Sequence, residues 1–254
     1  MGAEIEVRPS AEAAHEEWTT GAPGRLRRTL PEARSVLAVV SRPGDEACYL
    51  GAVLDAFRVG GSEVSVLAFS RGDASPFNDS MQRLGSIRPF EFDAAASALR
   101  AAHCLLADYP EAELRRLPIA HLAERVIRMI REWRVDLLVT VDGRVGDRTA
   151  ANVACRAGRE LAIPVMGWTL PHAVARSVRE ATGLSVTGDA ERRIDFELRV
   201  RRTIQRYAML AHWSQSRGDG THLARLAVQG DREWLRWLVP APACEEEPAG
   251  RGTE

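Results

Sequence analysis

Lysine is absent from this 254-residue sequence, and all 34 basic residues are therefore arginine. Without lysine, the chain has no side-chain amine for a Schiff base, for a P-loop or for a Ser-Lys nucleophile pair. The exclusive use of arginine suggests a GC-rich genome of actinobacterial type, because arginine codons are rich in GC and lysine codons are not. Enzyme classes that depend on a catalytic lysine are thereby excluded.

The chain also lacks a strong excess of charge and any long apolar run. Its formal net charge is -1, which argues against a general binder of nucleic acid or of acidic membranes. No run of about twenty apolar residues predicts a transmembrane helix, and residues 1–6 are too acidic and polar for a secretory signal. We therefore expect a cytoplasmic protein with neither nucleic-acid nor membrane partners.

Cysteine is scarce, and its positions show no metal-binding spacing. The four cysteines, Cys48, Cys104, Cys155 and Cys244, lie far apart and form no Cys-x-x-Cys pair. In a chain without a secretion signal, such cysteines are more often free thiols than parts of a disulfide or metal framework. We expect all four to be free.

Short β-branched runs alternate with amphipathic helical segments through the middle of the chain. Strands are expected at 35–40, 63–69, 135–141 and 164–168, and helices at 49–59, 92–102, 119–134 and 150–161. This alternation predicts an α/β fold, Rossmann-like and doubly wound, with a mostly parallel sheet flanked by helices on both faces.

The composition changes at both ends of this alternating region. Residues 1–34 are polar with scattered Pro and Gly, which is typical of an N-terminal extension, and residues 239–254 read as a disordered acidic tail. Residues 35–238 contain no linker and no repeat, so a single α/β domain is expected there.

Polar loops follow three of the predicted strands. In a doubly wound sheet, ligands bind outside the carboxyl ends of the strands, so the loops after residues 40, 69 and 141 should converge on one crevice. The first loop carries Asp45 and Glu46, and the third carries Asp142 and Asp147. Taken one at a time, these carboxylates fit helix capping somewhat better than a site.

Several short motifs occur in an order and spacing typical of one family. They are Arg42-Pro-Gly-Asp-Glu46, Ser70-Arg-Gly-Asp73, Arg88-Pro-Phe-Glu91 before Ala94-Ala-Ala96, Asp108-Tyr-Pro110, Asp136-Leu-Leu-Val-Thr140 and Ala208-Met-Leu-Ala-His212-Trp-Ser-Gln215. Over about residues 35–238 the chain resembles the PIG-L/LmbE family of zinc-dependent N-deacetylases, which act on amino sugars and related small molecules. Each motif is weak alone, but their order and spacing together are specific.

The positions that hold zinc in that family carry other residues here. The family's opening His-Pro-Asp-Asp-Glu supplies a His and its second Asp as ligands, and a later His is the third; the matching positions are Arg42, Asp45 and Ala150. A guanidinium repels a cation and alanine has no donor atom. The position of the family's catalytic base is Gly44, and that of a second, assisting His is Asp147. The resemblance therefore implies a degenerate zinc site and no metal or other cofactor.

The substrate side of the family's pocket is better retained. The resemblance implies that Arg88 and Asp108 lie where relatives hold the hydroxyls of a sugar or cyclitol, with Asp73, Asp142 and His172 as further binding candidates. A surface salt bridge for Arg88 and a loop-capping role for Asp108 are as compatible with the sequence as substrate binding is. The expected partner is a polar small molecule, such as an amino sugar or a nucleoside-like compound, and a homo-oligomer is compatible with the sequence.

Of the six histidines, only His172 is expected near the crevice, whereas His103 and His121 are expected on helix faces. No histidine lies between His121 and His172, so no shift of the alignment restores a ligand in the later loop.

Two functional interpretations remain open. In the first, the pocket performs metal-free acid–base chemistry, such as amide hydrolysis or formation. Its candidate acid and base groups are Asp45, Glu46 and Asp147, with Arg42 or Arg148 stabilising negative charge. In the second, the chain is a non-catalytic descendant that binds a ligand or a partner protein. A conventional zinc deacetylase is disfavoured.

Charged residues, Arg42 and Asp147, stand at two positions where the family has histidine. This suggests that the crevice was remodelled for another role rather than having only lost its original residues. We therefore expect Arg42 to pair with Asp45, and Arg148 to pair with Asp147 or Asp142. A remodelled hydrolase pocket encoded in a GC-rich genome fits a pathway of specialised metabolism.

Overall fold

The computed structural model describes residues 26–72, 81–216 and 220–241. Within these residues, seven strands form one sheet in the order β3-β2-β1-β4-β5-β7-β6. The strands are β1 Ser35–Val40, β2 Glu63–Ser70, β3 His103–Tyr109, β4 Leu137–Val141, β5 Val165–Thr169, β6 Phe196–Arg199 and β7 Arg232–Val239. The first five pair in parallel, and β7 runs antiparallel to both β5 and β6. The predicted mostly parallel α/β sheet is confirmed.

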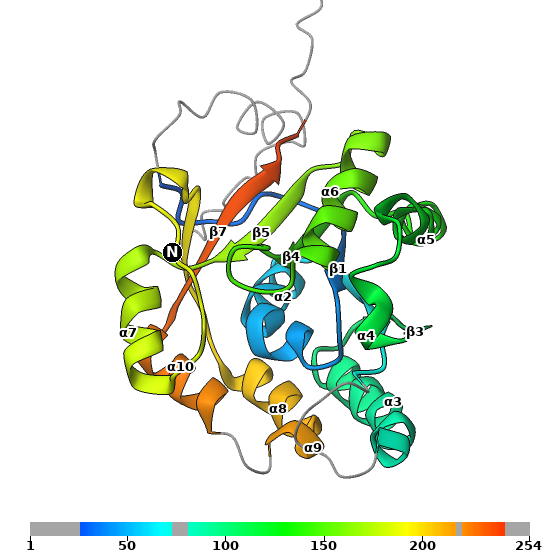
Figure 1. Ribbon diagram of the computed structural model, residues 1–254. Helices are drawn as coiled ribbons and strands as arrows, with labels where there is room; N and C mark the ends of the chain where they lie inside the picture. The colour runs from blue at the N-terminus through cyan, green and yellow to red at the C-terminus, as the bar shows by residue number, and fades with distance from the viewer. Residues whose placement is uncertain (1–25, 73–80, 217–219, 242–254) are drawn as a thin grey trace, which may run out of the picture.

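Helices cover both faces of the sheet (Figure 1). They are η1 Glu46–Leu50, a π-helix, α2 Gly51–Val59, α3 Met81–Ala98, α4 Glu111–Leu114, α5 Ile119–Glu132, α6 Arg148–Leu161, α7 His172–Thr182, η2 Glu191–Arg193 (a 3₁₀ helix), α8 Thr203–Ala211, α9 Trp213–Ser216 and α10 Thr221–Gln229. No helix in the described ranges combines the length and the apolar character needed to span a bilayer.

Alternation along β1 shows how the sheet divides the core into two buried clusters. Val36, Ala38 and Val40 face one cluster, which contains side chains of α2, α3, α7, α8 and α10. Leu37 and Val39 face the other, which contains side chains of α5 and α6. Successive side chains of a strand point to opposite faces, so a strand buried on both sides reads as one continuous apolar run.

The segment from 81 to 109 differs from the sequence expectation. The helix expected at 92–102 begins at Met81, contains Pro89 in its interior and ends at Ala98. His103, expected on a helix face, instead begins β3, where its ring stacks on Trp133 with centroids 4.9 Å apart. An edge strand is only partly buried and so lacks the continuous apolar run that marked the other strands.

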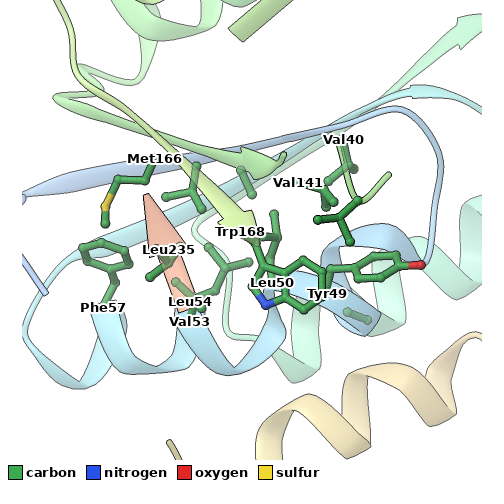
Figure 2. Packing of buried hydrophobic residues seen from close by; sticks show 14 of the residues in the cluster. Val40, Tyr49, Leu50, Val53, Leu54, Phe57, Val141, Met166, Trp168 and Leu235 are labelled. Atoms are coloured by element: carbon green, nitrogen blue, oxygen red, sulfur yellow. The ribbon is translucent and has the colours of Figure 1, made fainter. Parts of the chain in front are cut away.

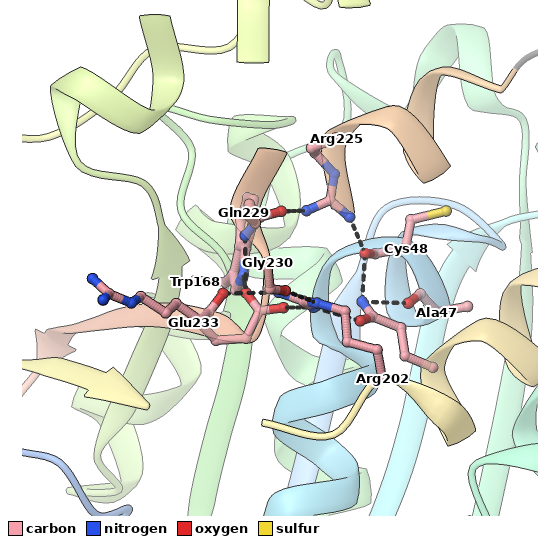
Figure 3. Close-up of polar contacts among 10 residues, drawn as sticks. Ala47, Cys48, Trp168, Arg202, Arg225, Gln229, Gly230 and Glu233 are labelled. Atoms are coloured by element: carbon pink, nitrogen blue, oxygen red, sulfur yellow. Dashed lines mark hydrogen bonds and ion pairs between the residues drawn. The ribbon is translucent and has the colours of Figure 1, made fainter. Parts of the chain in front are cut away.

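A buried ionic network attaches the C-terminal strand and helix to the rest of the core (Figure 3). Glu233 is fully buried and accepts hydrogen bonds from Arg202 Nη1 at 2.5 Å and from the indole Nε1 of Trp168 at 2.5 Å. Arg225, also fully buried, donates to the backbone oxygen of Cys48 and to Gln229. Burial lowers the pKa of Arg225, and the charge of Glu233 opposes that effect.

The same arginine supports an aromatic pair in the core. The guanidinium carbon of Arg225 lies 5.0 Å from the ring centroid of Tyr49 and 5.2 Å from that of Trp168. The two rings are themselves 5.1 Å apart, and Figure 2 shows them among the buried residues of this cluster. A desolvated cation over an aromatic face is a stabilising contact. The ring of Tyr49 is thus packed against both Arg225 and Trp168.

We expect Glu233→Gln to lower the free energy of unfolding by about 3 kcal/mol, because it leaves two buried guanidinium groups without a buried carboxylate. Urea unfolding followed by circular dichroism measures the change. The matched control is Asp231→Asn, whose carboxylate pairs with Arg199 on the surface and should change stability by less than about 0.5 kcal/mol. Equal effects of the two variants would contradict the importance of the network.

Candidate functional site

Two neighbouring parallel strands, β1 and β4, end at a small recess. Its lining comes from the ends of these strands and from the segments that follow them: Val40, Ser41, Arg42, Asp45, Tyr49, Thr140, Val141, Gly146, Asp147 and Ala150. The space open to a water-sized group is about 20 Å³, which is close to the room that one water needs. We call this site the recess. Only a single small functional group of a ligand can enter it.

The loop after β1 and the loop after β4 converge on the recess, as expected from strand order. The loop after β2 meets the first of them, because the backbone and hydroxyl of Ser70 both donate to Ser41 O at 3.0 Å. None of its described residues lines the recess. The described part of the loop after β2 therefore contacts the loop after β1 without lining the recess.

Arg42 forms the expected ion pair with Asp45 and a second one with a residue of α4. Its Nε lies 3.4 Å from Asp45 Oδ1, and its Nη1 lies 3.3 Å from Glu111 Oε1. The charge of Asp45 is the largest influence on Arg42 and raises the pKa of the guanidinium above its usual value, with a smaller contribution from Glu111. Arg42 is therefore a fixed positive charge between two carboxylates.

The pKa of the Asp45 carboxyl group lies much closer to 7 than that of an ordinary aspartate. Burial raises its pKa to about 6, the charge of Arg42 pulls the pKa down, and the charge of Glu46 raises it further. A carboxyl group with a pKa near the working pH can both accept and release a proton. Perturbed carboxylates of this kind gather at functional sites, although structural ion pairs also produce them.

Asp147 combines a capping role with a place in the recess wall. Its Oδ1 accepts from Thr149 N at 2.7 Å at the start of α6, and its Oδ2 accepts from Arg115 Nε at 3.2 Å. Burial would raise the pKa of Asp147, but the hydrogen bonds from Thr149 and the charge of Arg115 outweigh burial and hold the pKa below its usual value. Asp147 thus stays ionised at neutral pH.

Glu46 points into the interior and fixes the loop after β1. Its carboxylate accepts from Gly44 N at 2.8 Å and lies 2.5 Å from His212 Nε2, with both side chains buried. Gly44 itself has φ of 100°, a conformation that strains any residue with a side chain. An aspartate at the family's base position would therefore be strained in this loop.

His212, which follows α8, contacts Glu46 of the segment after β1, whereas the expected His172 makes no such contact. His172 begins α7, is exposed and does not line the recess. The chain beyond His212 is also anchored to α3, because the backbone N and the hydroxyl of Ser214 donate to the two oxygens of Glu91, each at 2.7 Å. Two matched motifs of the sequence thus meet in space.

Of the predicted substrate-side residues, Arg88 and Asp108 do not line the recess. Arg88 is buried in α3 and donates to Gly72 O. Asp108 is largely exposed and pairs with Arg71 at 2.7 Å, which is a surface salt bridge. Asp73 lies outside the described residues. Arg88 and Asp108 therefore both contact the segment that follows β2.

Asp142 is buried and holds the loop after β4 to β7. It accepts from Arg144 N at 3.1 Å and from Arg236 Nε at 2.5 Å. The expected pairing of Arg148 is wrong, because Asp142 bonds Arg236 and Asp147 bonds Arg115, whereas Arg148 is exposed on α6. Position 148 follows the capping residue directly, and the first turn of the helix directs its side chain outward.

Three hydroxyl-bearing residues of the wall were missed from the sequence. Ser41 is buried, and its Oγ has no hydrogen-bond partner among the described residues. Thr140 Oγ1 donates to Val39 O at 2.8 Å, and burial raises the pKa of Tyr49 to about 12, so that this phenol stays protonated. The place of Tyr49, one helical turn after Asp45, is the signal that could have identified it.

The residues of the recess do not fit a zinc ion. The family's three ligand positions hold Arg42, Asp45 and Ala150, and the guanidinium of Arg42 is paired with the one carboxylate among them. Across the part of the chain that the structure describes, no three His, Cys, Asp or Glu side chains are grouped so as to hold a metal. A four-coordinate zinc site needs three or four such donors.

Comparison with known proteins gives one family and one fold. Residues 37–155 match the family model described as PIG-L, GlcNAc-PI de-N-acetylase. A triple-mutant deacetylase of teicoplanin biosynthesis, Orf2, is similar in structure with a TM-score of 0.62 and 22% identity, over 82% of this chain and 99% of that one. No curated protein matches the chain in sequence.

Two further solved structures share the fold. The N,N'-diacetylchitobiose deacetylase from Pyrococcus horikoshii has a TM-score of 0.57 and 14% identity, over 92% of this chain and 95% of that one. The 4-carboxy-2-hydroxymuconate hydratase GalB from Pseudomonas putida has a TM-score of 0.58 and 15% identity, over 85% and 100%. At these identities the likeness shows the fold alone.

The raised pKa of Asp45 predicts a pH-dependent effect of Asp45→Asn on stability. The folded-state pKa of about 6 lies above the usual 3.8, so the folded state binds more protons between these values and loses stability as the pH rises through that window. Asp45→Asn should therefore be more stable than the wild type by about 1–2 kcal/mol at pH 7.5. The difference should disappear near pH 4.

Urea unfolding at the two pH values measures this difference. Glu63→Gln serves as the control, because Glu63 is about half exposed and its substitution should change stability little at either pH. A stability difference for Asp45→Asn that does not depend on pH would contradict the inferred titration.

Proposed function

Residues 37–155 of the chain belong to the PIG-L family of de-N-acetylase-like proteins, and we propose that the recess performs acid–base chemistry on a polar small molecule without the family's zinc. The observation that carries this proposal is the ion pair of Arg42 with Asp45 at 3.4 Å. A guanidinium stands where relatives have a metal-binding histidine, and it is bound to the one carboxylate that remains. The positive charge of the site is thus supplied by the chain itself.

Asp45 is the proposed general base and Arg42 the proposed electrostatic partner. In amide hydrolysis, the oxygen of water bonds to the acyl carbon while its proton passes to Asp45. The C–N bond then breaks as that proton is delivered to the leaving nitrogen. Arg42 would stabilise the negative charge that develops on the carbonyl oxygen. The same groups in the reverse order form an amide bond.

The proposed ligand is a polar molecule that places one functional group in the recess. A space of about 20 Å³ excludes a sugar ring, which must remain at the mouth of the recess. The titles of the similar structures name teicoplanin biosynthesis and N,N'-diacetylchitobiose, and these names support a sugar-bearing or amino-sugar ligand. The teicoplanin likeness also supports the proposed place in specialised metabolism.

A second candidate is a ligand-binding protein without turnover. The observation that favours it is that two of the three candidate carboxylates are already engaged. Glu46 is held by Gly44 and His212, and Asp147 caps α6 and pairs with Arg115. Only Asp45 is then available for proton transfer.

Amine release from N-acetylated amino sugars tests the proposal. We expect turnover by the purified protein to persist after treatment with a strong zinc chelator, and Asp45→Asn to lower kcat by about 100-fold or more, because it removes the only available base. Asp231→Asn, at an exposed residue that does not line the recess, is the control and should retain full activity.

The competing outcomes are distinct. Stoichiometric zinc in the purified protein, together with loss of turnover on chelation, would overturn the metal-free proposal. Saturable binding of the sugars without any amine release would support the non-catalytic candidate instead.

A further inference from the structure

The recess carries more negative than positive charge. The carboxylates of Asp45 and Asp147 line it, and Glu111 adjoins it through Arg42. Arg42 is the single cation in the described wall. Arg115, which pairs with Asp147, has a side chain that is 79% exposed, so water screens its charge. A cationic ligand group is therefore favoured over an anionic one in the resting site.

The hydroxyl of Ser41 provides a second and independent indication of a ligand. The residue is 5% exposed, it lines the recess, and its Oγ is buried without a hydrogen-bond partner in the described part of the chain. Buried polar atoms are nearly always hydrogen-bonded in folded proteins. An exception in the wall of a functional recess points to a group that binds there.

The wall is rich in acceptors and small in volume. Asp45 and Asp147 are carboxylate acceptors, Ser41 Oγ can accept, and Thr140 Oγ1 has lone pairs left because it uses its hydrogen toward Val39 O. An ammonium group carries three donors and no acceptor. It is about the size of a water molecule, so it fits a space of about 20 Å³, which is too small for a sugar ring.

We propose that the recess binds the ammonium group of a primary-amine ligand, with Asp45, Asp147 and Ser41 as acceptors. This inference rests on the proposed function, because hydrolysis of an N-acyl group yields a primary amine and amide formation consumes one. It narrows the ligand from polar molecules in general to those with a free amine. Arg42 remains paired to Asp45 and Glu111 at the side of the recess.

Binding of matched ligand pairs to the full chain at pH 7 tests the proposal. Glucosamine should bind at least about tenfold more tightly than N-acetylglucosamine in calorimetric titration, since charged hydrogen bonds are the strong ones. Methylammonium should raise the melting temperature, whereas tetramethylammonium, which is larger and has no donor, and KCl at the same ionic strength should not.

The variants assign the effect to the recess. Asp147→Asn keeps a residue that caps helices well and should weaken glucosamine binding by about tenfold, and Ser41→Ala should weaken it by about threefold. Asp231→Asn should have no effect. Circular dichroism of each variant before titration separates loss of binding from loss of folding.

The binding results distinguish the ammonium site from the amino-sugar ligand. Equal affinity for the two sugars would overturn the ammonium site and leave the sugar-binding proposal standing. Binding of methylammonium without either sugar would support the ammonium site and contradict the amino-sugar ligand. Stabilisation by KCl equal to that by methylammonium, or no binding of any amine, would overturn the inference.

Discussion

The hydrogen-bonded pair of Glu46 and His212 joins two parts of the chain that are 166 residues apart in sequence. On one side it fixes the loop after β1, because the same carboxylate accepts from Gly44 N. On the other side it fixes the end of α8 against that loop. The positions of Arg42 and Asp45 follow from this constraint, since both belong to the loop that Glu46 holds.

Charged side chains dominate the surroundings of the recess. Arg42 lies between Asp45 and Glu111, and Asp147 lies between Thr149 and Arg115. The two aspartates share one wall but differ in their proton affinity. Burial has the largest effect on both pKa values, but at Asp147 the hydrogen bonds from Thr149 and the charge of Arg115 together outweigh it. A pair of carboxylates whose pKa values are pushed apart is how one site provides both an ionised and a protonatable group at neutral pH.

The sequence predicted the fold well because alternating apolar runs and amphipathic helices are local patterns. The strands at 35–40 and 63–69 were found nearly to the residue, since both are buried on the two sides. β3 was missed because its pattern is that of a partly exposed edge, and the Arg88-Pro pair concealed the first half of α3. Secondary structure at edges and at unusual prolines depends on tertiary contacts.

The site was predictable only in part, for a related reason. Residues next to the strand ends, such as Asp45 and Asp147, could be placed by topology alone. The partners that decide their chemistry could not, because Glu111, Arg115 and His212 come from distant segments. No local pattern signals that a buried hydroxyl such as that of Ser41 lacks a partner.

The arginine that stacks behind Tyr49 has a consequence for exchanging segments between relatives. Arg225 lies 5.0 Å from the centroid of the Tyr49 ring, yet it belongs to the C-terminal third of the chain, beyond the segment that matches the family. Transplanting residues 37–155 into another scaffold would carry the ends of β1 and β4, Asp45 and Asp147, but not the arginine that packs against Tyr49. The geometry of the recess therefore depends on the C-terminal part of the fold as well, and the transplanted segment alone would not reproduce it.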